Sequence, residues 1–191
     1  VITDAWHPQV NGVVRALGHL QIEVQAMGHE LLMITTQDKT TILCPTYPEI
    51  RLVINARAST AAKLDAFEPD AVHIATEGPL GLAARRYYLR RAMPFTTSLH
   101  TRFAENLEMR LPLFRASLGY RYLRWFHGAA QRTMVTTDLL RPELADKGFN
   151  NLVTGVAQRA NLLLTSLCSN NSGVATICSC CQPAYRLPTG N

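Results

Sequence analysis

Residues 69–91 read PDAVHIATEGPLGLAARRYYLRR, and this stretch contains the repeating unit from which the fold is predicted. The short apolar run AVHIA at 71–75 has the length and composition of a buried strand. A polar segment follows, and a run of helical period then extends from Gly78 to Arg91. A strand, a turn containing an acid and a glycine, and a helix therefore follow one another directly.

The same alternation recurs on both sides of this unit. A helix is predicted over 11–27, with Gly28 just beyond its C-terminus, and Ser59 is expected to cap the N-terminus of another. The predicted strands are 1–3, 31–35, 71–75, 95–99 and 133–137. Short strands that alternate with helices of ten or more residues predict an α/β domain with a doubly wound, Rossmann-like parallel sheet.

Composition limits the class of protein. The chain has 191 residues, 47% of them hydrophobic, which suffices for one sizeable core and not for two full α/β domains. Its net charge of +5 is a mild basic excess. No apolar run reaches the ~20 residues of a membrane span, and no stretch resembles a secretory signal. These features predict a cytoplasmic protein.

The composition changes at about residue 154. No Asp, Glu or Lys occurs from Thr154 to Asn191, and Ser, Thr, Asn and Cys are abundant there. We expect a domain at 1–153 and an atypical tail at 154–191, which is either a poorly ordered extension or the product of a changed reading frame. Cys178 and Cys181 match half a zinc clip, but no second spaced pair exists, and we expect no metal site.

Candidate functional residues follow the predicted strands, because ligands of such sheets bind beyond the carboxyl ends of the strands. Gly12, directly before a helix, would let backbone N–H groups approach a phosphate, although a structural turn explains it equally well. Glu77 could accept hydrogen bonds from sugar hydroxyls or simply favour a helix N-terminus. His100 could bind a hydroxyl or meet developing charge, and Arg102 could meet a phosphate or lie on the surface.

Four arginines of the run 84–91 form a candidate membrane surface. Arg85, Arg86, Arg90 and Arg91 lie on a helix with aromatic neighbours, which is typical of a helix that rests on an anionic bilayer. An ordinary solvated face is the alternative. Nucleic acid is not expected as a partner, because no RNA-binding or helix-turn-helix motif accompanies the charge.

Five motifs, in this order, resemble the N-terminal half of the retaining glycosyltransferases of family 4, whose GT-B fold has two facing Rossmann-like domains. They are TDAWHPQVNGVVRAL (3–17), CPTYPEIRL (44–52), PDAVHIATEGPLGLAARRY (69–87), PFTTSLHTRF (94–103) and RWFHGAAQRTMVTT (124–137). The resemblance covers 1–153 and is strongest to bacterial nucleotide-sugar-dependent α-mannosyltransferases and sulfoquinovosyl transferases.

The resemblance implies transfer of a hexosyl group from a nucleotide sugar to a lipid or saccharide acceptor. The favoured sugar is mannose, with GDP-mannose as the donor. The resemblance also implies retention of configuration, no metal and no cofactor. The implied roles are a catalytic group for His100, donor diphosphate binding for Asn11, Gly12 and Val13, and sugar or acceptor binding for Thr76, Glu77, Thr101 and Arg102.

The sequence also departs from the family pattern. Ala104, Glu105 and Asn106 stand where the family usually has Pro-Glu-Tyr, and the motifs of a second, nucleotide-binding domain are not found. We therefore expect the isolated chain to be inactive. The alternatives are a non-enzymatic acceptor- or membrane-docking module, and the remnant of a truncated gene. If a bilayer is involved, we expect peripheral binding at the inner face of the membrane.

Overall fold

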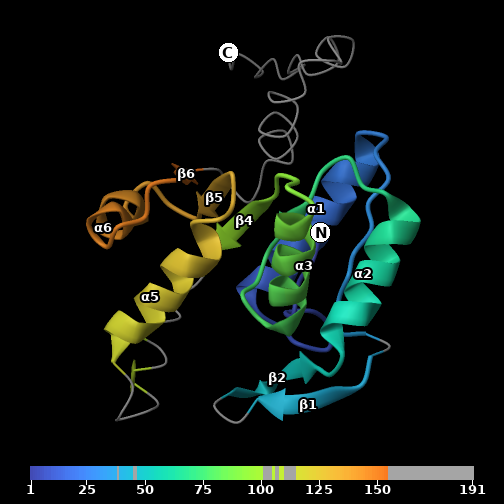
Figure 1. The fold of residues 1–191 in the computed structure, drawn as a ribbon, viewed down its shortest axis with the longest axis horizontal. Coiled ribbons are helices and arrows are strands. Elements are labelled where there is room, and N and C mark those ends of the chain that lie inside the picture. Colours follow the sequence, from blue (N-terminus) through green and yellow to red (C-terminus); the bar gives the residue numbers. More distant parts are fainter. Residues whose placement is uncertain (38, 45–46, 101–104, 106–107, 110–114, 155–191) are drawn as a thin grey trace, which may run out of the picture.

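The computed structural model describes residues 1–37, 39–44, 47–100, 105, 108–109 and 115–154. Of the predicted tail at 154–191, Thr154 is the last residue of a strand and the rest lies outside the described residues. Figure 1 shows the described helices and strands. The helices are α1 (Gly12–Ala26), α2 (Ala56–Phe67), α3 (Pro79–Arg90), α5 (Ala116–His127) and α6 (Leu140–Asp146). The strands are β1 (Thr41–Cys44), β2 (Tyr47–Val53), β3 (His73–Ile74), β4 (Thr96–Leu99), β5 (Arg132–Val135) and β6 (Leu152–Thr154).

A parallel sheet with the strand order β3-β4-β5-β6 forms the centre of the molecule. Ile2 extends it at the β3 edge, where its N–H donates to the His73 carbonyl (2.9 Å) and its carbonyl accepts from the N–H of Ala75 (2.8 Å). Ile2 also forms a parallel bridge with Ile34. The prediction of a parallel α/β sheet is confirmed, with the first two predicted strands reduced to bridges.

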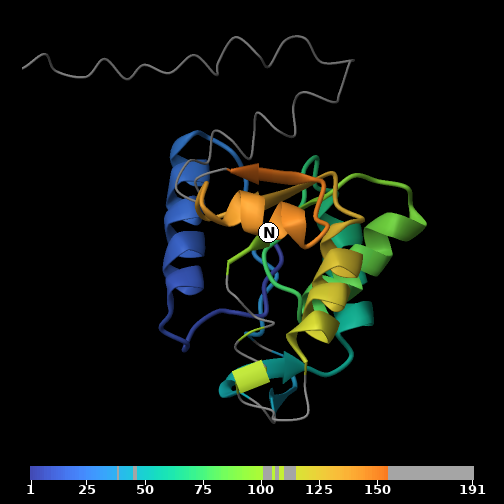
Figure 2. The same ribbon diagram turned by 90° about the vertical axis from the view of Figure 1, so that its left-hand side faces the viewer.

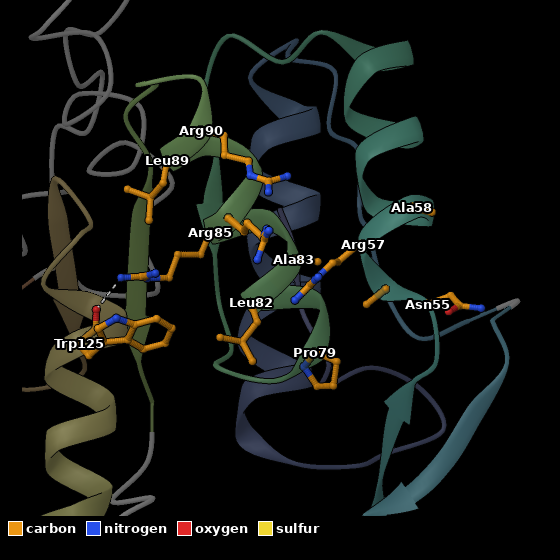
Figure 3. Close-up of a pocket in the computed structure, with 12 residues that line it drawn as sticks. Asn55, Arg57, Ala58, Pro79, Leu82, Ala83, Arg85, Leu89, Arg90 and Trp125 are labelled. Atoms are coloured by element: carbon orange, nitrogen blue, oxygen red, sulfur yellow. Dashed lines mark hydrogen bonds between the residues drawn. The ribbon is translucent and has the colours of Figure 1, made fainter.

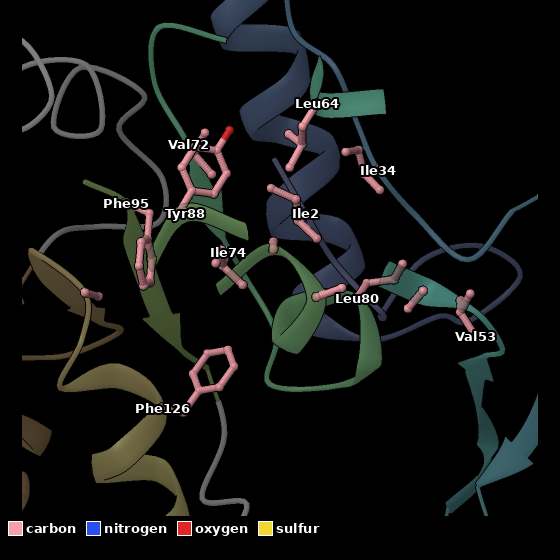
Figure 4. Packing of buried hydrophobic residues seen from close by; sticks show 14 residues of the cluster. Ile2, Ile34, Val53, Leu64, Val72, Ile74, Leu80, Tyr88, Phe95 and Phe126 are labelled. Carbon is pink, nitrogen blue, oxygen red and sulfur yellow. The ribbon is translucent and has the colours of Figure 1, made fainter. Parts of the chain in front are cut away.

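Helices cover both faces of this sheet, as the doubly wound prediction requires. Figure 2 shows α1 on one side, with α2 and α3 on the other. The buried face of α1 packs against Trp6 and Met134, whereas α2 and α3 share the cluster around Ile2 and Ile74 (Figure 4). Each fully buried aliphatic side chain contributes about 1.5–3 kcal/mol, so both helical layers stabilise the sheet.

A third cluster fixes α5 and α6 to the other half of the sheet. Its buried side chains come from these two helices, from β4 to β6 and from the turn after α6, and they are Leu99, Leu123, Val135, Leu144, Phe149 and Leu152. The cluster places the C-terminal end of α5 beside the loop that follows β3. This placement matters for the site below.

The helix boundaries agree with the sequence at α1 and differ at α2. Asn11 caps α1 by accepting a hydrogen bond from the N–H of Val14 (3.0 Å), and Gly28 follows with φ +81°, a conformation that favours glycine. The expected cap at Ser59 is wrong, because α2 begins at Ala56 and the Ser59 hydroxyl donates to the Ala56 carbonyl inside the helix (3.3 Å). Ser can bond within a helix as well as cap one, so its presence alone does not mark a start.

Three features were not predicted: the antiparallel hairpin β1–β2, the helix α5 and the edge strand β6. The hairpin lacks the Asn-Gly or Asp-Gly turn that marks such a pair in sequence. None of the helices in the described ranges is long and apolar enough to cross a membrane.

Candidate functional site

Asp4 joins the loop after Ile2 to the loop after β3. Its backbone N–H donates to the Thr76 hydroxyl (2.7 Å), and that hydroxyl donates to Oδ2 of Asp4 (3.0 Å). Both segments leave the sheet at the carboxyl ends of neighbouring strands, so the hydrogen bonds fix their relative position at the edge where ligands of such sheets bind.

The Asp4 carboxylate also caps α3. Oδ1 accepts from the N–H of Leu80 (3.0 Å) and Oδ2 from the N–H of Gly81 (3.4 Å), while the N-cap residue Gly78 supplies no side chain. A Cβ at Gly78 would lie 2.5 Å from the Asp4 carboxyl group, so any other residue there would displace this carboxyl group from its capping position. Burial raises the pKa of Asp4 to about 6, although the hydrogen bonds from Leu80, Thr76 and Gly81 oppose the shift.

Glu77, one residue further along this loop, is held by α5. Its Oε1 lies 3.1 Å from Nε2 of His127, and its backbone carbonyl accepts a hydrogen bond from the Tyr122 hydroxyl (2.6 Å). A carboxylate only accepts, so Nε2 of His127 carries the proton, and Nδ1 faces the Thr97 hydroxyl at 2.9 Å. The carboxylate is therefore fixed on one side and keeps a second oxygen for a ligand.

His100 follows the last residue of β4 and is half-buried. Its Nε2 is buried and has no hydrogen-bond partner in the described ranges. Burial lowers the pKa of His100, the Glu77 carboxylate opposes this shift, and His127 adds to it. These influences place the three side chains in one electrostatic environment, with a neutral imidazole nitrogen available for hydrogen bonding.

His73 plays a structural part beneath this edge of the sheet. The Thr96 hydroxyl donates to the Val72 carbonyl (3.2 Å), so it accepts from Nδ1–H of His73 (2.9 Å), and Nε2 of His73 accepts from Ser98 (2.7 Å). Burial lowers the pKa of His73 to about 3, and the ring is neutral near neutral pH. His73 therefore links β3 to β4 through side-chain hydrogen bonds, in addition to the backbone pairing of the two strands.

The first loop presents the N-terminus of α1 at the same edge. The cap uses the N–H groups of Val14 and Arg15, both of which donate to Asn11, so those of Gly12 and Val13 lie outside helical hydrogen bonding. A Cβ added to Gly12 would meet nothing within 4 Å. The fold therefore does not require glycine at this position.

The structure thus brings Thr76, Glu77 and His100 together and joins them to the first loop through Asp4. Thr101 and Arg102 lie outside the described residues. Across the described ranges, no group of three or more His, Cys, Asp or Glu side chains is arranged to hold a metal ion.

The four arginines expected on a membrane-facing surface do not form one surface. The expectation is wrong for Arg85, which is buried. Its Nε donates to the Phe126 carbonyl (3.0 Å) and its Nη2 to the Trp125 carbonyl (2.8 Å). Arg91 pairs with Asp65 (3.1 Å). Arg86 and Arg90 are exposed and make no described ion pair.

The sequence does not single out Asp4, Tyr122 or His127 as parts of the site. One feature of the sequence points to Asp4. The helix α3 begins without a polar cap residue of its own, and Asp4 is an acid that directly follows a buried strand and can supply the missing cap. No feature of the sequence points to His127 or Tyr122, because their contacts depend on where α5 packs.

A parallel sheet with helices on both faces defines a Rossmann-like α/β domain, a class in which ligands bind beyond the strand ends, where the polar side chains of this chain gather. The model of the Glycosyltransferase Family 4 domain matches residues 10–154 of this chain. The chain therefore belongs to glycosyltransferase family 4, and its domain is the N-terminal, Rossmann-like half of a GT-B glycosyltransferase. Neither the curated proteins nor the solved structures contain a significant match.

Proposed function

We propose that this domain forms the acceptor-side half of the catalytic cleft of a retaining glycosyltransferase that uses a nucleotide sugar. GDP-mannose is the first donor to test, and the acceptor is a lipid or a saccharide. The observation that carries the proposal is that Glu77 and His100 lie near enough to interact electrostatically at the strand-end edge of a family 4 domain. The proposed reaction needs no metal and no cofactor.

His100 is proposed to act beside the transferred sugar. Its unpartnered Nε2 can form a hydrogen bond with a sugar hydroxyl, and its neutral ring can do so without a repelling charge. Glu77, held in place by His127, can accept a hydrogen bond from the acceptor hydroxyl. The Thr76 hydroxyl is already engaged with Asp4, which supports a positioning role for Thr76 within this acceptor region.

Asn11, Gly12 and Val13 are proposed to face the donor diphosphate. Two backbone N–H groups at the N-terminus of a 15-residue helix suit an anion, and the missing Cβ of Gly12 allows a close approach. The nucleotide itself is assigned to a second domain, without which we expect no turnover. Thr101 and Arg102 keep their proposed sugar contacts.

A fusion of this chain to the nucleotide-binding domain of a family 4 enzyme tests the proposal. The fusion would be incubated with radiolabelled GDP-mannose or UDP-glucose and membrane lipid extract, and labelled product would be counted. We expect transfer by the fusion, none by the chain alone, and a loss of about 100-fold or more in His100→Ala.

His19→Ala is the matched control, because His19 is an exposed histidine of α1. Equal losses in both histidine variants would contradict a specific role for His100. A folded fusion that binds nucleotide but transfers no sugar from either donor would contradict the proposed function. Turnover by the isolated chain would refute the need for a second domain.

A further inference from the structure

A cavity of about 910 Å³ lies between α2, α3 and α5, among side chains that the proposed reaction does not use. Its apolar wall is formed by Leu82 and Ala83 of α3 and by Trp125 of α5 (Figure 3). Its positive charge comes from Arg57, Arg86 and Arg90. None of the described residues that line it is Asp or Glu. We call it the arginine groove.

The three arginines are free to bind a ligand. Arg57, Arg86 and Arg90 are exposed, and no described acid forms an ion pair with any of them. Figure 3 shows Arg57 reaching from α2 toward α3, with Arg90 on α3 beside the same space. Arg90 and then Arg57 lower the pKa of Arg86 through charge repulsion, so the three cations act on one another. An anion bound among them would relieve that repulsion.

The start of α2 adds to the positive potential of the groove, and Arg85 makes one of its walls rigid. The first turn of α2 lines it and contains no acidic residue, and the N-cap Asn55 makes no side-chain hydrogen bond to that turn. Unused N–H groups at a helix start add positive potential. Arg85 gives the groove a fixed wall, because its guanidinium stacks on Trp125 at 3.9 Å while bonding the end of α5.

We propose that the arginine groove binds a phosphate group, with an apolar portion of the same ligand against Leu82 and Trp125. Three guanidinium groups on two helices match the several oxygens of a phosphate, whereas one arginine already satisfies a carboxylate in a bidentate pair. The phosphate belongs to a soluble phosphate ester or to a lipid headgroup. The inference does not depend on the proposed function.

Calorimetric titration with inorganic pyrophosphate and sedimentation with phosphatidylcholine vesicles, with and without phosphatidic acid, separate the two sources. The test variants are Arg57→Gln, Arg86→Gln and Arg90→Gln. The matched controls are Arg51→Gln, Arg132→Gln and Arg141→Gln, which remove the same charge from exposed residues outside the groove. The fluorescence of Trp125, compared with that of Trp125→Phe, reports occupancy independently.

We expect each groove variant to weaken binding roughly tenfold and each control variant to change it little. Groove-dependent binding of pyrophosphate supports a soluble phosphate ligand, and groove-dependent binding of phosphatidic acid vesicles alone supports a lipid headgroup. Equal weakening by groove and control variants would show that only net charge matters. That result, or no binding of either probe, overturns the proposal.

Discussion

Nε2 of His127 lies 3.1 Å from Oε1 of Glu77, so a fully buried imidazole on α5 orients a carboxylate 50 residues earlier in the chain. The other ring nitrogen faces Thr97, whose hydroxyl meets that of Thr133 at 3.0 Å. The carboxylate therefore stands at the end of a hydrogen-bonded row that crosses the sheet.

The first prediction concerns this pair. His127→Phe should lower the free energy of unfolding by about 1–3 kcal/mol, because it leaves Thr97 and Glu77 without their shared partner. Urea denaturation of His127→Phe, Glu77→Gln and the double variant forms a thermodynamic cycle. Strictly additive losses would show that the two side chains do not stabilise each other.

The second prediction concerns the cap of α3. Asp4→Ala should cost about 1–2 kcal/mol of stability, since the N–H groups of Leu80 and Gly81 and the Thr76 hydroxyl lose their acceptor. Asp70→Ala is the control, because Asp70 is exposed and makes no described hydrogen bond. Urea midpoints measure both. Equal midpoints for the two variants would contradict the capping role.

The third prediction compares two glycines. A Cβ at Gly81 would overlap the carbonyl oxygen of Thr76, a backbone atom, so Gly81→Ala should destabilise the fold by about 3 kcal/mol or more. Gly12→Ala meets no atom within 4 Å and should leave stability unchanged or slightly raised. In the fusion, Gly12→Ala should weaken donor binding. Unchanged donor affinity would remove Gly12 from the proposed diphosphate contact.

The fourth prediction is a pH dependence. The pKa of His73 is about 3 in the folded protein and about 6.5, its ordinary value, in the unfolded chain, so between these pH values the unfolded state binds more protons. The contribution of His73 to stability should therefore fall as the pH is lowered through this window. The contribution of Asp4 to stability should change in the opposite direction, rising as the pH is lowered, because folding raises the pKa of Asp4 from 3.8 to about 6.

Comparing wild type with His73→Asn cancels the contribution of Asp4, which both proteins share. The difference in their free energies of unfolding, measured by urea titration across this pH range, should shrink on acidification. A difference that does not vary with pH would show that His73 titrates alike in the folded and unfolded states.

The fifth prediction separates two adjacent arginines. Arg85→Met should lower stability by about 1–3 kcal/mol, because two carbonyls at the end of α5 lose a charged donor. Arg86→Met should change it by less than about 0.5 kcal/mol, since Arg86 is exposed. Thermal unfolding distinguishes the two. A larger loss in Arg86→Met would reverse the assignment of the buried arginine.

The fold could be predicted from the sequence because local signals repeat along it. Apolar runs such as 71–75 and 95–99, separated by helical stretches, suffice to indicate a parallel sheet. The hairpin β1–β2 escaped prediction because it depends on pairing across a turn without a strong signal. Helix α5 carries no polar side-chain cap at Arg115, so its start is not marked in the sequence.

The candidate site was predicted in part for the same reason. Glu77 and His100 directly follow strands, and strand ends converge at one edge. Arg85 could not be told from Arg86 and Arg90 in the sequence, because two adjacent pairs of arginines do not show which member faces the core. The burial of Arg85 depends on α5, which lies about 40 residues away in the chain.

The sequence by itself determined the α/β alternation, the cap of α1 and which residues stand at strand ends, because each of these depends on neighbours along the chain. Only the tertiary structure decided that Asp4 caps α3, that His127 holds Glu77 and that three free arginines line one groove. Those contacts join residues from different elements. Their geometry follows from the order of strands and the packing of helices, which no local pattern specifies.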